Sequence, residues 1–199
     1  MSAARAEVAL FPLNTVLFPG GLLPLRIFEQ RYMEMAKGCL RDGTPFGVCL
    51  IRAGREVGEA AEPENIGCLA RILEWDMQQL GMLLVTVRGE QRFRIVERRV
   101  ESNGLARATV ELLPLEADAA LPGEFDACAG LLKRVLEERG AGLFAEPHRF
   151  DSASWVGARL SEILPVPLAA KQKLMELDDA MQRIEILYKF LVQHRLTGG

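Results

Sequence analysis

The spacing of the apolar residues changes at Pro114, and this change constrains the fold more than any other feature of the sequence. Before Pro114, apolar residues recur with a period of 2 in short runs between glycines and prolines, which is typical of β-strands. After Pro114 the period is about 3.6, which is typical of amphipathic helices. We therefore predict an α+β fold with a β-rich subdomain over residues 1–115 and a helical bundle subdomain over residues 116–199.

Two local patterns in the first part predict particular elements. Residues 92–101 and 105–113 flank Ser102-Asn103-Gly104. Asn and Gly tolerate the positive φ of a tight turn, so these two segments should pair antiparallel. Residues 27–40 depart from the β pattern, because their apolar residues recur at helical spacing. The apolar stripe of this expected helix consists of Phe28, Tyr32, Met35, Ala36, Cys39 and Leu40.

The second part contains signals for the ends of several helices. Gly140 is placed to end the helix that precedes it. Asp151 or Ser152 is placed to begin the next helix, and Asp179 begins a capping box for the last one. A shorter helix is expected over residues 168–177.

The composition excludes several classes of function. With a formal net charge of −3 and a pI of about 5.6, the chain has no overall attraction to phosphate backbones or anionic lipid. Its four cysteines are far apart and lack the CxxC spacing of zinc or redox sites, so we interpret them as small buried hydrophobes. No apolar run approaches the ~18 to 20 residues that a membrane span needs. We therefore predict a cytoplasmic protein that binds no membrane, no metal ion and no cofactor.

The sequence indicates no catalytic site. A phosphate-binding loop needs closely spaced glycines followed by Lys and Ser or Thr, whereas Gly20-Gly21 leads into Leu22 without a lysine. No serine lies in a nucleophile elbow, and neither His148 nor His194 has a second ligand at metal-binding spacing. We therefore predict no catalytic residues and a protein that is not an enzyme.

Three ordered motifs resemble the N-terminal substrate-binding (LON) domain family of Lon proteases. The first is LFPLNTVLFPGGLLPLRIFEQRY at residues 10–32, the second is GCLARI at 67–72, and the third is GEQRFRI at 89–95. The segment 171–177, followed by Arg183, is similar to the family's helical end. The resemblance covers nearly the whole chain, and it implies a free-standing form of the domain that lacks the ATPase and serine–lysine peptidase domains.

The resemblance also implies an architecture. This is a twisted β-sheet pseudo-barrel of the PUA-like kind, with one inserted helix, followed by a helical bundle. One departure is the hairpin after Trp75, where residues 76–81 replace the family's usual short Asp-Gly turn. In the third motif, Arg92 and Phe93 should point to opposite sides of a strand, with Phe93 buried.

We interpret the motif residues as mainly structural. Proline fixes φ and glycine adopts turn conformations closed to other residues, which sets the path of the loop before residue 24. Phe28 and Tyr32 are expected in the core. Glu29 and Arg31 should point in different directions on the helix, each anchoring a neighbouring backbone group or charge. The residues with an expected structural role are Pro12, Phe18, Pro19, Gly20, Pro24, Phe28, Glu29, Arg31, Tyr32, Gly67, Gly89, Arg92 and Phe93.

The function that we expect is that of a non-catalytic polypeptide-binding module, acting as an adaptor or a weak holdase. Its ligands would be unfolded or flexible polypeptide segments, and a separate protease or chaperone would be a partner. Apolar side chains at loop tips and beside the unusual hairpin are candidates for peptide contact, and the alternative for each is a place in the core. These candidates are Leu17, Leu22, Leu23, Trp75 and Met77. We make no prediction of the client or of the oligomeric state.

An RNA-binding protein of PUA-like fold is the alternative. It is suggested by arginines that cluster within one hairpin region, namely Arg88, Arg92, Arg94, Arg98, Arg99 and Arg107. Glutamates interleave with them, so cross-strand ion pairs on a solvated face explain the cluster. These glutamates are Glu90, Glu97, Glu101 and Glu111. We therefore expect that nucleic acid is not the ligand.

Overall fold

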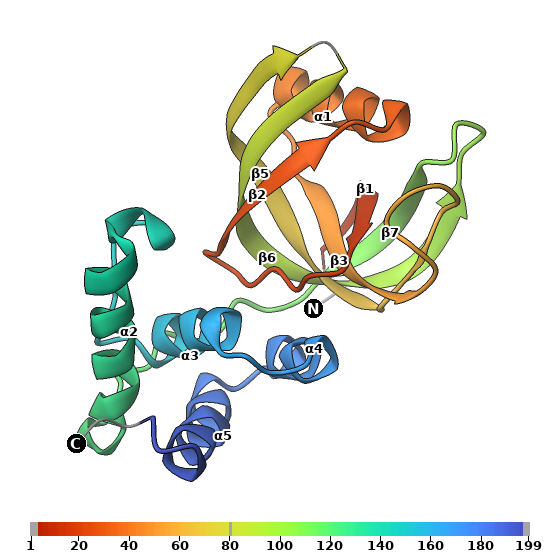
Figure 1. Ribbon diagram of the computed structural model, residues 1–199. Coiled ribbons are helices and arrows are strands. Elements are labelled where there is room, and N and C mark those ends of the chain that lie inside the picture. The colour runs from red at the N-terminus through yellow and green to blue at the C-terminus, as the bar shows by residue number, and fades with distance from the viewer. Residues whose placement is uncertain (1–3, 80, 197–199) are drawn as a thin grey trace. The chain divides into compact units, whose positions relative to one another are not determined.

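The computed structural model describes residues 4–79 and 81–196. Its contacts divide the chain into two compact units, Met1–Leu113 and Pro114–Gly199. Within the described residues, the first unit holds all seven strands and one α-helix, and the second unit holds four α-helices (Figure 1). The protein therefore has a mixed α and β fold with a large, mainly antiparallel sheet.

The bounds of the elements are as follows. The strands are β1 Arg5–Leu13, β2 Leu22–Ile27, β3 Phe46–Ala53, β4 Glu62–Pro63, β5 Ile66–Gln79, β6 Met82–Val100 and β7 Ala106–Leu112. The α-helices are α1 Gln30–Asp42, α2 Asp126–Arg139, α3 Ala153–Ile163, α4 Leu168–Glu176 and α5 Ala180–Gln193. Short 3-10 helices cover Gly123–Phe125 and Ala141–Leu143.

β1 pairs with two strands, β7 and β3, so the sheet closes on itself through β1. The order is β1-β7-β6-β5-β3-β4, and β1 also pairs in parallel with β3. β6 is the longest strand, and β2 pairs with its first half while β7 pairs with its second half. The expected antiparallel pairing around residues 102–104 is confirmed, and Gly104 has the positive φ, 83°, that the turn requires.

The helix expected over residues 27–40 begins three residues later, at Gln30, and ends at Asp42. Its residue Tyr32 is buried as expected. Phe28 precedes the helix, and its side chain is 54% exposed, so the prediction that Phe28 belongs to the core is wrong. The physical reason is that Glu29 is the N-cap residue with an extended backbone, which takes Phe28 out of the helical register.

Two apolar clusters form the core of the β-rich unit. The larger contains side chains from β1, β2, β3, β5, β6 and α1, and in it the rings of Phe11 and Tyr32 stack with centroids 4.1 Å apart. The second cluster contains Leu10, Phe93 and Val110. Successive residues of a strand point to opposite faces, so the neighbours Leu10 and Phe11 belong to different clusters.

The predicted helix ends in the second unit are confirmed. Ser152 is the N-cap of α3, where its hydroxyl oxygen accepts a hydrogen bond from the Trp155 backbone N–H at 3.2 Å. The Asp179 carboxylate caps α5 through the backbone N–H groups of residues 181 and 182. Gly140 follows the last residue of α2. Side chains that satisfy free backbone donors at the start of a helix stabilise it there.

A buried ion pair links α5 to the segment before α2. Arg183 is 1% exposed, and its guanidinium binds both carboxylate oxygens of Glu116, with Nη1 and Oε2 2.8 Å apart. It also donates to the backbone carbonyls of Leu174 and Leu177, each at 2.8 Å. One arginine therefore connects three segments of the helical unit.

Candidate functional site

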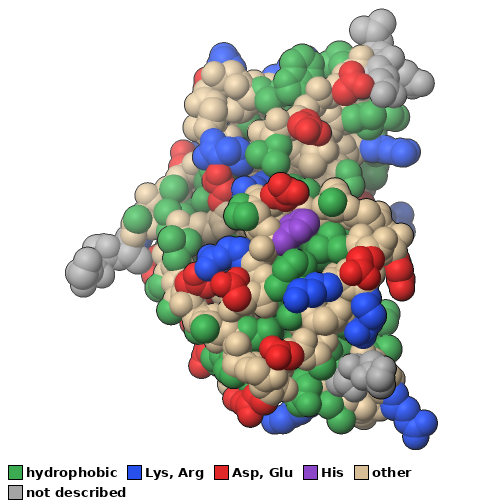
Figure 2. Space-filling view, turned by 90° about the vertical axis from the view of Figure 1, so that its left-hand side faces the viewer, with side chains coloured by type: hydrophobic (Ala, Val, Ile, Leu, Met, Phe, Trp, Pro, Cys, Tyr) green, Lys and Arg blue, Asp and Glu red, His purple; other side chains and the backbone are tan. Residues whose placement is uncertain are grey.

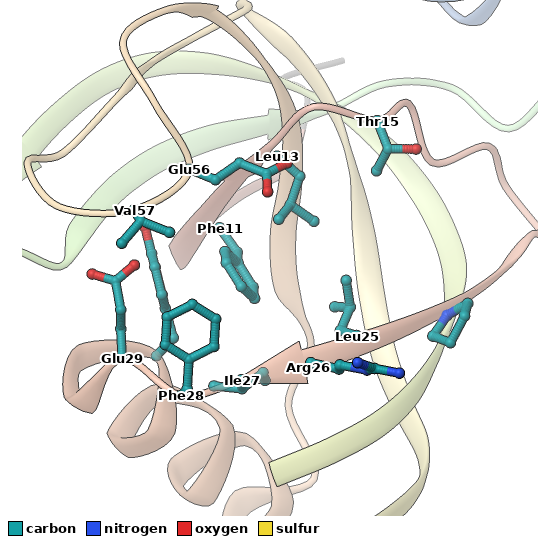
Figure 3. A pocket seen from close by; sticks show the side chains of 12 residues that line it. Phe11, Leu13, Thr15, Leu25, Arg26, Ile27, Phe28, Glu29, Glu56 and Val57 are labelled. Atoms are coloured by element: carbon teal, nitrogen blue, oxygen red, sulfur yellow. The ribbon is translucent and has the colours of Figure 1, made fainter. Parts of the chain in front are cut away.

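A groove opens beside β2 in the β-rich unit, as Figure 3 shows. Its volume is about 330 Å³, at the lower end of the range typical of ligand sites. The walls come from β1 and the residues that follow it, from β2, from the start of α1 and from the loop after β3.

The floor of the groove is continuous with the apolar core of the β-rich unit. Phe11, Leu13, Leu25 and Tyr32 supply it, and all four belong to or pack against the larger apolar cluster. Within the floor, the rings of Phe11 and Tyr32 stack on each other. Burial raises the pKa of the Tyr32 hydroxyl, so this group stays neutral. The floor is thus mainly apolar, and its one hydroxyl is uncharged.

Two exposed apolar side chains stand at the mouth of the groove. Phe28 is 54% exposed and Val57 is 56% exposed. Figure 3 shows both of them gathered with Glu29 at one end of the groove, while Thr15 lies toward the other end. Large apolar side chains beside an apolar groove are typical of a binding surface.

Two carboxylates, those of Glu29 and Glu56, line the groove. Glu56 lines it and accepts a hydrogen bond from the Asn14 backbone N–H at 2.5 Å. Glu29 lies 3.0 Å from the Arg31 guanidinium. Glu29 and Arg31 each contact a neighbouring charge, as predicted, but they face each other rather than pointing in different directions, because Glu29 precedes the helix. Arg31 also donates to the Gly104 carbonyl at 2.9 Å, which ties the start of α1 to the β6–β7 turn.

None of the five candidate contact residues lines this groove. Leu17 is 4% exposed, which favours its alternative place in the core. Leu22 and Leu23 are half-buried on β2. Trp75 and Met77 are exposed on β5, at 60% and 40%. The structure places Leu23 and Trp75 in one sheet, on strands that both pair with β6.

Sequence reasoning missed Phe28 and Val57 as members of a site. Phe28 fitted the apolar stripe of the helix expected over residues 27–40, so its exposure was not predicted. Val57 carries a weak signal, because it is an isolated apolar residue in a polar, glycine-containing stretch between Glu56 and Gly58. Such a residue has no core partner within its own segment.

Several motif residues contact the backbone or the core of the β-rich unit. Gly89 faces the backbone of Phe18, and Gly20, with a φ of 75°, donates to the Gly89 carbonyl at 2.7 Å. Gly67 faces Phe93, which is fully buried. Arg92, which precedes Phe93 on β6, is also buried, at 3% exposure.

The hairpin arginines are largely engaged by other groups. Arg99 forms an ion pair with Glu7 and lowers its pKa, and Arg107 forms one with Glu101 at 2.8 Å. Arg98 donates to a backbone carbonyl at 3.0 Å. On the face that Figure 2 shows, basic and acidic side chains are interspersed rather than segregated. Of the expected ion pairs, the one between Arg107 and Glu101 is confirmed, whereas Arg99 pairs with Glu7, which was not among the expected partners.

Other chemistry is sparse among residues 4–79 and 81–196. In that part of the chain no helix is long and apolar enough to cross a membrane. The same residues contain no group of three or more His, Cys, Asp or Glu side chains placed to hold a metal ion. Burial raises the pKa of Cys49 to about 12 and that of Cys128 to about 11, which keeps both thiols protonated and unreactive.

Comparisons with known proteins give a consistent result. The family model of the ATP-dependent protease La (LON) substrate-binding domain matches residues 7–193. The crystal structure of a Lon N-terminal domain protein from Xanthomonas campestris is 36% identical, with a TM-score of 0.76, and the match covers 92% of this chain and 96% of that one.

Two curated relatives are much longer than this chain. Lon protease of Cytophaga hutchinsonii is 26% identical over 191 residues, which cover 89% of this chain and 23% of the protease. Protein cereblon of Gallus gallus is 30% identical over 115 residues, which cover 56% of this chain and 24% of cereblon. The chain thus matches about a quarter of the length of either relative.

Proposed function

The chain belongs to the LON substrate-binding domain family, and from this membership we propose that it binds unfolded or flexible polypeptide segments as an adaptor or weak holdase. The domain itself is non-catalytic. A separate protease or chaperone would receive the bound segment. A cytoplasmic location, a division into residues 1–115 and 116–199, and a PUA-like pseudo-barrel are parts of the same proposal. The pairing of β1 with both β7 and β3 supports the pseudo-barrel.

The observation that carries the proposal is the pair Phe28 and Val57 above an apolar floor. Burying apolar surface contributes roughly 25 cal/mol per Å², so a polypeptide side chain that covers both residues gains free energy. A flexible ligand loses conformational entropy when it binds, which offsets part of this gain. We therefore expect affinities that are micromolar or weaker. Trp75 and Met77 are proposed as a second contact region on β5.

We expect Phe28→Ala to weaken binding of an unfolded client by about fivefold to thirtyfold, the effect of removing one central apolar contact. The measurement is a titration of isotope-labelled protein with a reduced, alkylated client, followed by amide chemical shifts. Val100→Ala is the matched control, because Val100 is also exposed, at 52%, and does not line the groove. Unchanged affinity in Phe28→Ala, or no shifts in the wild type at millimolar client, would contradict the proposal.

We also expect no tight RNA binding near physiological salt, because glutamates form ion pairs with Arg99 and Arg107 and the chain has a net charge of −3. The check is a salt titration with fluorescent RNA, comparing the wild type with the double substitution Arg88→Ala and Arg94→Ala. These two side chains are exposed, whereas Arg92 is buried and unsuitable for the test. Sub-micromolar binding with a steep salt dependence that the double substitution abolishes would favour RNA instead.

A further inference from the structure

The backbone of β2 has a free edge. Among the described residues, β2 pairs with β6 alone, in a register that places Leu23 opposite Val87. Gly89 directs both of its backbone groups toward the start of β2, because its N–H donates to the Gly21 carbonyl at 2.9 Å and its carbonyl accepts from the Gly20 N–H at 2.7 Å. Hydrogen-bonded pairs alternate along an antiparallel ladder. The odd-numbered residues of β2 therefore bond to β6, and the even-numbered residues direct their backbone groups away from it.

Pro24 agrees with this assignment. Proline has no N–H, and within sheets it is found where a strand edge needs no donor. Pro24 lies opposite Thr86, at an even-numbered position, so the ladder to β6 loses no hydrogen bond. On the free edge, Pro24 offers a carbonyl only, while Leu22 and Arg26 each offer a carbonyl and an N–H.

The free edge borders the groove. Pro24, Arg26 and Phe28 are all among the lining residues. The opposite wall comes from the last residues of β1, which pair with β3 and not with β2. Figure 3 shows β1 and β2 as separate walls with apolar side chains between them. An extended segment placed along β2 would find hydrogen-bonding partners on one side and the apolar floor beneath.

The side chains around the groove select the chemistry of such a segment. Alternate residues of an added strand point to one face, so those above the floor should be apolar. At the Phe28 end, Glu29 lines the groove, and Glu59 lies in the adjoining depression that shares Glu29 with it. Arg31 balances Glu29, which leaves an acidic excess there. A lysine or arginine complements that excess.

We propose that this protein binds its polypeptide ligand by strand addition to the free edge of β2. The ligand is an extended segment with apolar side chains at alternate positions and a basic side chain at the end next to Phe28. The inference rests on the proposed function and adds to it the binding mode and the class of segment.

The first test compares Arg26→Pro with Arg26→Ala. Both remove the guanidinium, but only proline also removes the N–H on the free edge, and neither change affects the bonds to β6. The probe is a fluorescein-labelled peptide with alternating leucine and serine and two terminal lysines, measured by fluorescence anisotropy. We expect Arg26→Pro to bind at least about fivefold more weakly than Arg26→Ala, as for the loss of one buried hydrogen bond.

A second test acts on the peptide and stays informative if Arg26→Pro fails to fold. Two versions carry backbone N-methyl groups on either the odd or the even residues. Strand addition predicts that one version loses binding and the other keeps it, because only one set of N–H groups faces β2. Replacing the lysines with glutamates should also weaken binding about threefold or more.

The outcomes separate the two proposals. If neither the peptide nor an unfolded client binds the wild type, the proposed function itself is wrong. If Phe28→Ala weakens binding while both methylated peptides bind like the parent, the groove binds polypeptide without strand addition, and only this inference is overturned. Equal affinity for the lysine and glutamate peptides would overturn the charge preference.

Discussion

Replacing Arg183 with methionine is expected to destabilise the helical unit by about 3–5 kcal/mol, the cost of leaving one partner of a buried ion pair uncompensated. Glu116 would keep its carboxylate in a site where it is 10% exposed. The carbonyls of Leu174 and Leu177 would lose their donor as well. The midpoint of thermal unfolding should fall by more than about 10 °C. Urea denaturation followed by Trp155 fluorescence measures the change within this unit.

The control is the ion pair between Arg149 and Asp118 in the same unit. Both side chains are about half exposed, so Arg149→Ala should change the unfolding free energy by less than about 1 kcal/mol. The double substitution Arg183→Met with Glu116→Leu should recover part of the loss, because an apolar pair leaves no buried charge. If Arg183→Met is no more destabilising than Arg149→Ala, the buried pair does not hold the helices together.

Gly89→Ala should destabilise the β-rich unit by about 2–4 kcal/mol, at the upper end of the effects of overpacking. A Cβ built on Gly89 lies 2.1 Å from the carbonyl oxygen of Phe18. That oxygen belongs to the backbone, so it cannot move aside as a flexible side chain would. The turn at Gly20 and Gly21, which exchanges two backbone hydrogen bonds with Gly89, would have to detach. Urea denaturation followed by circular dichroism and Trp75 fluorescence reports the loss.

Gly38→Ala is the same substitution at another glycine, and here we expect stability to increase rather than decrease. Gly38 lies inside α1, and a Cβ there meets no atom within 4 Å. Alanine in a helix interior is favoured over glycine by roughly 0.5–1 kcal/mol, so this variant should be slightly more stable than the wild type. Equal stability of the Gly89 and Gly38 variants would show that the Phe18 turn tolerates displacement.

Features that depend on neighbouring residues could be predicted from the sequence. The turn at Asn103-Gly104 and the caps at Ser152 and Asp179 each follow from the conformational preferences of one or two residues. The α1 boundary was misplaced by three residues, since periodicity alone does not locate the first residue of a helix. That small error concealed the exposure of Phe28.

Features that depend on distant residues could not be predicted in this way. Glu116 and Arg183 are 67 residues apart in sequence, and no local pattern connects them. The groove combines side chains from β1, β2, α1 and the loop at Val57, so it exists only once the sheet has formed. The free edge of β2 likewise depends on a distant pairing, because β2 pairs with the first half of β6 while β7 pairs with the second half.

The pairing between β1 and β7 sets an order of events during synthesis. Arg5 pairs with Glu111 and Ala9 with Arg107, whereas only the second half of β1 pairs with the earlier strand β3. At a translation rate of about 5–20 residues per second, the first half of β1 waits roughly 5–20 seconds for its partner. During that interval it presents an unpaired strand in the growing chain. If the protein binds unfolded polypeptide as proposed, its own first strand passes through a stage in which it resembles the ligand.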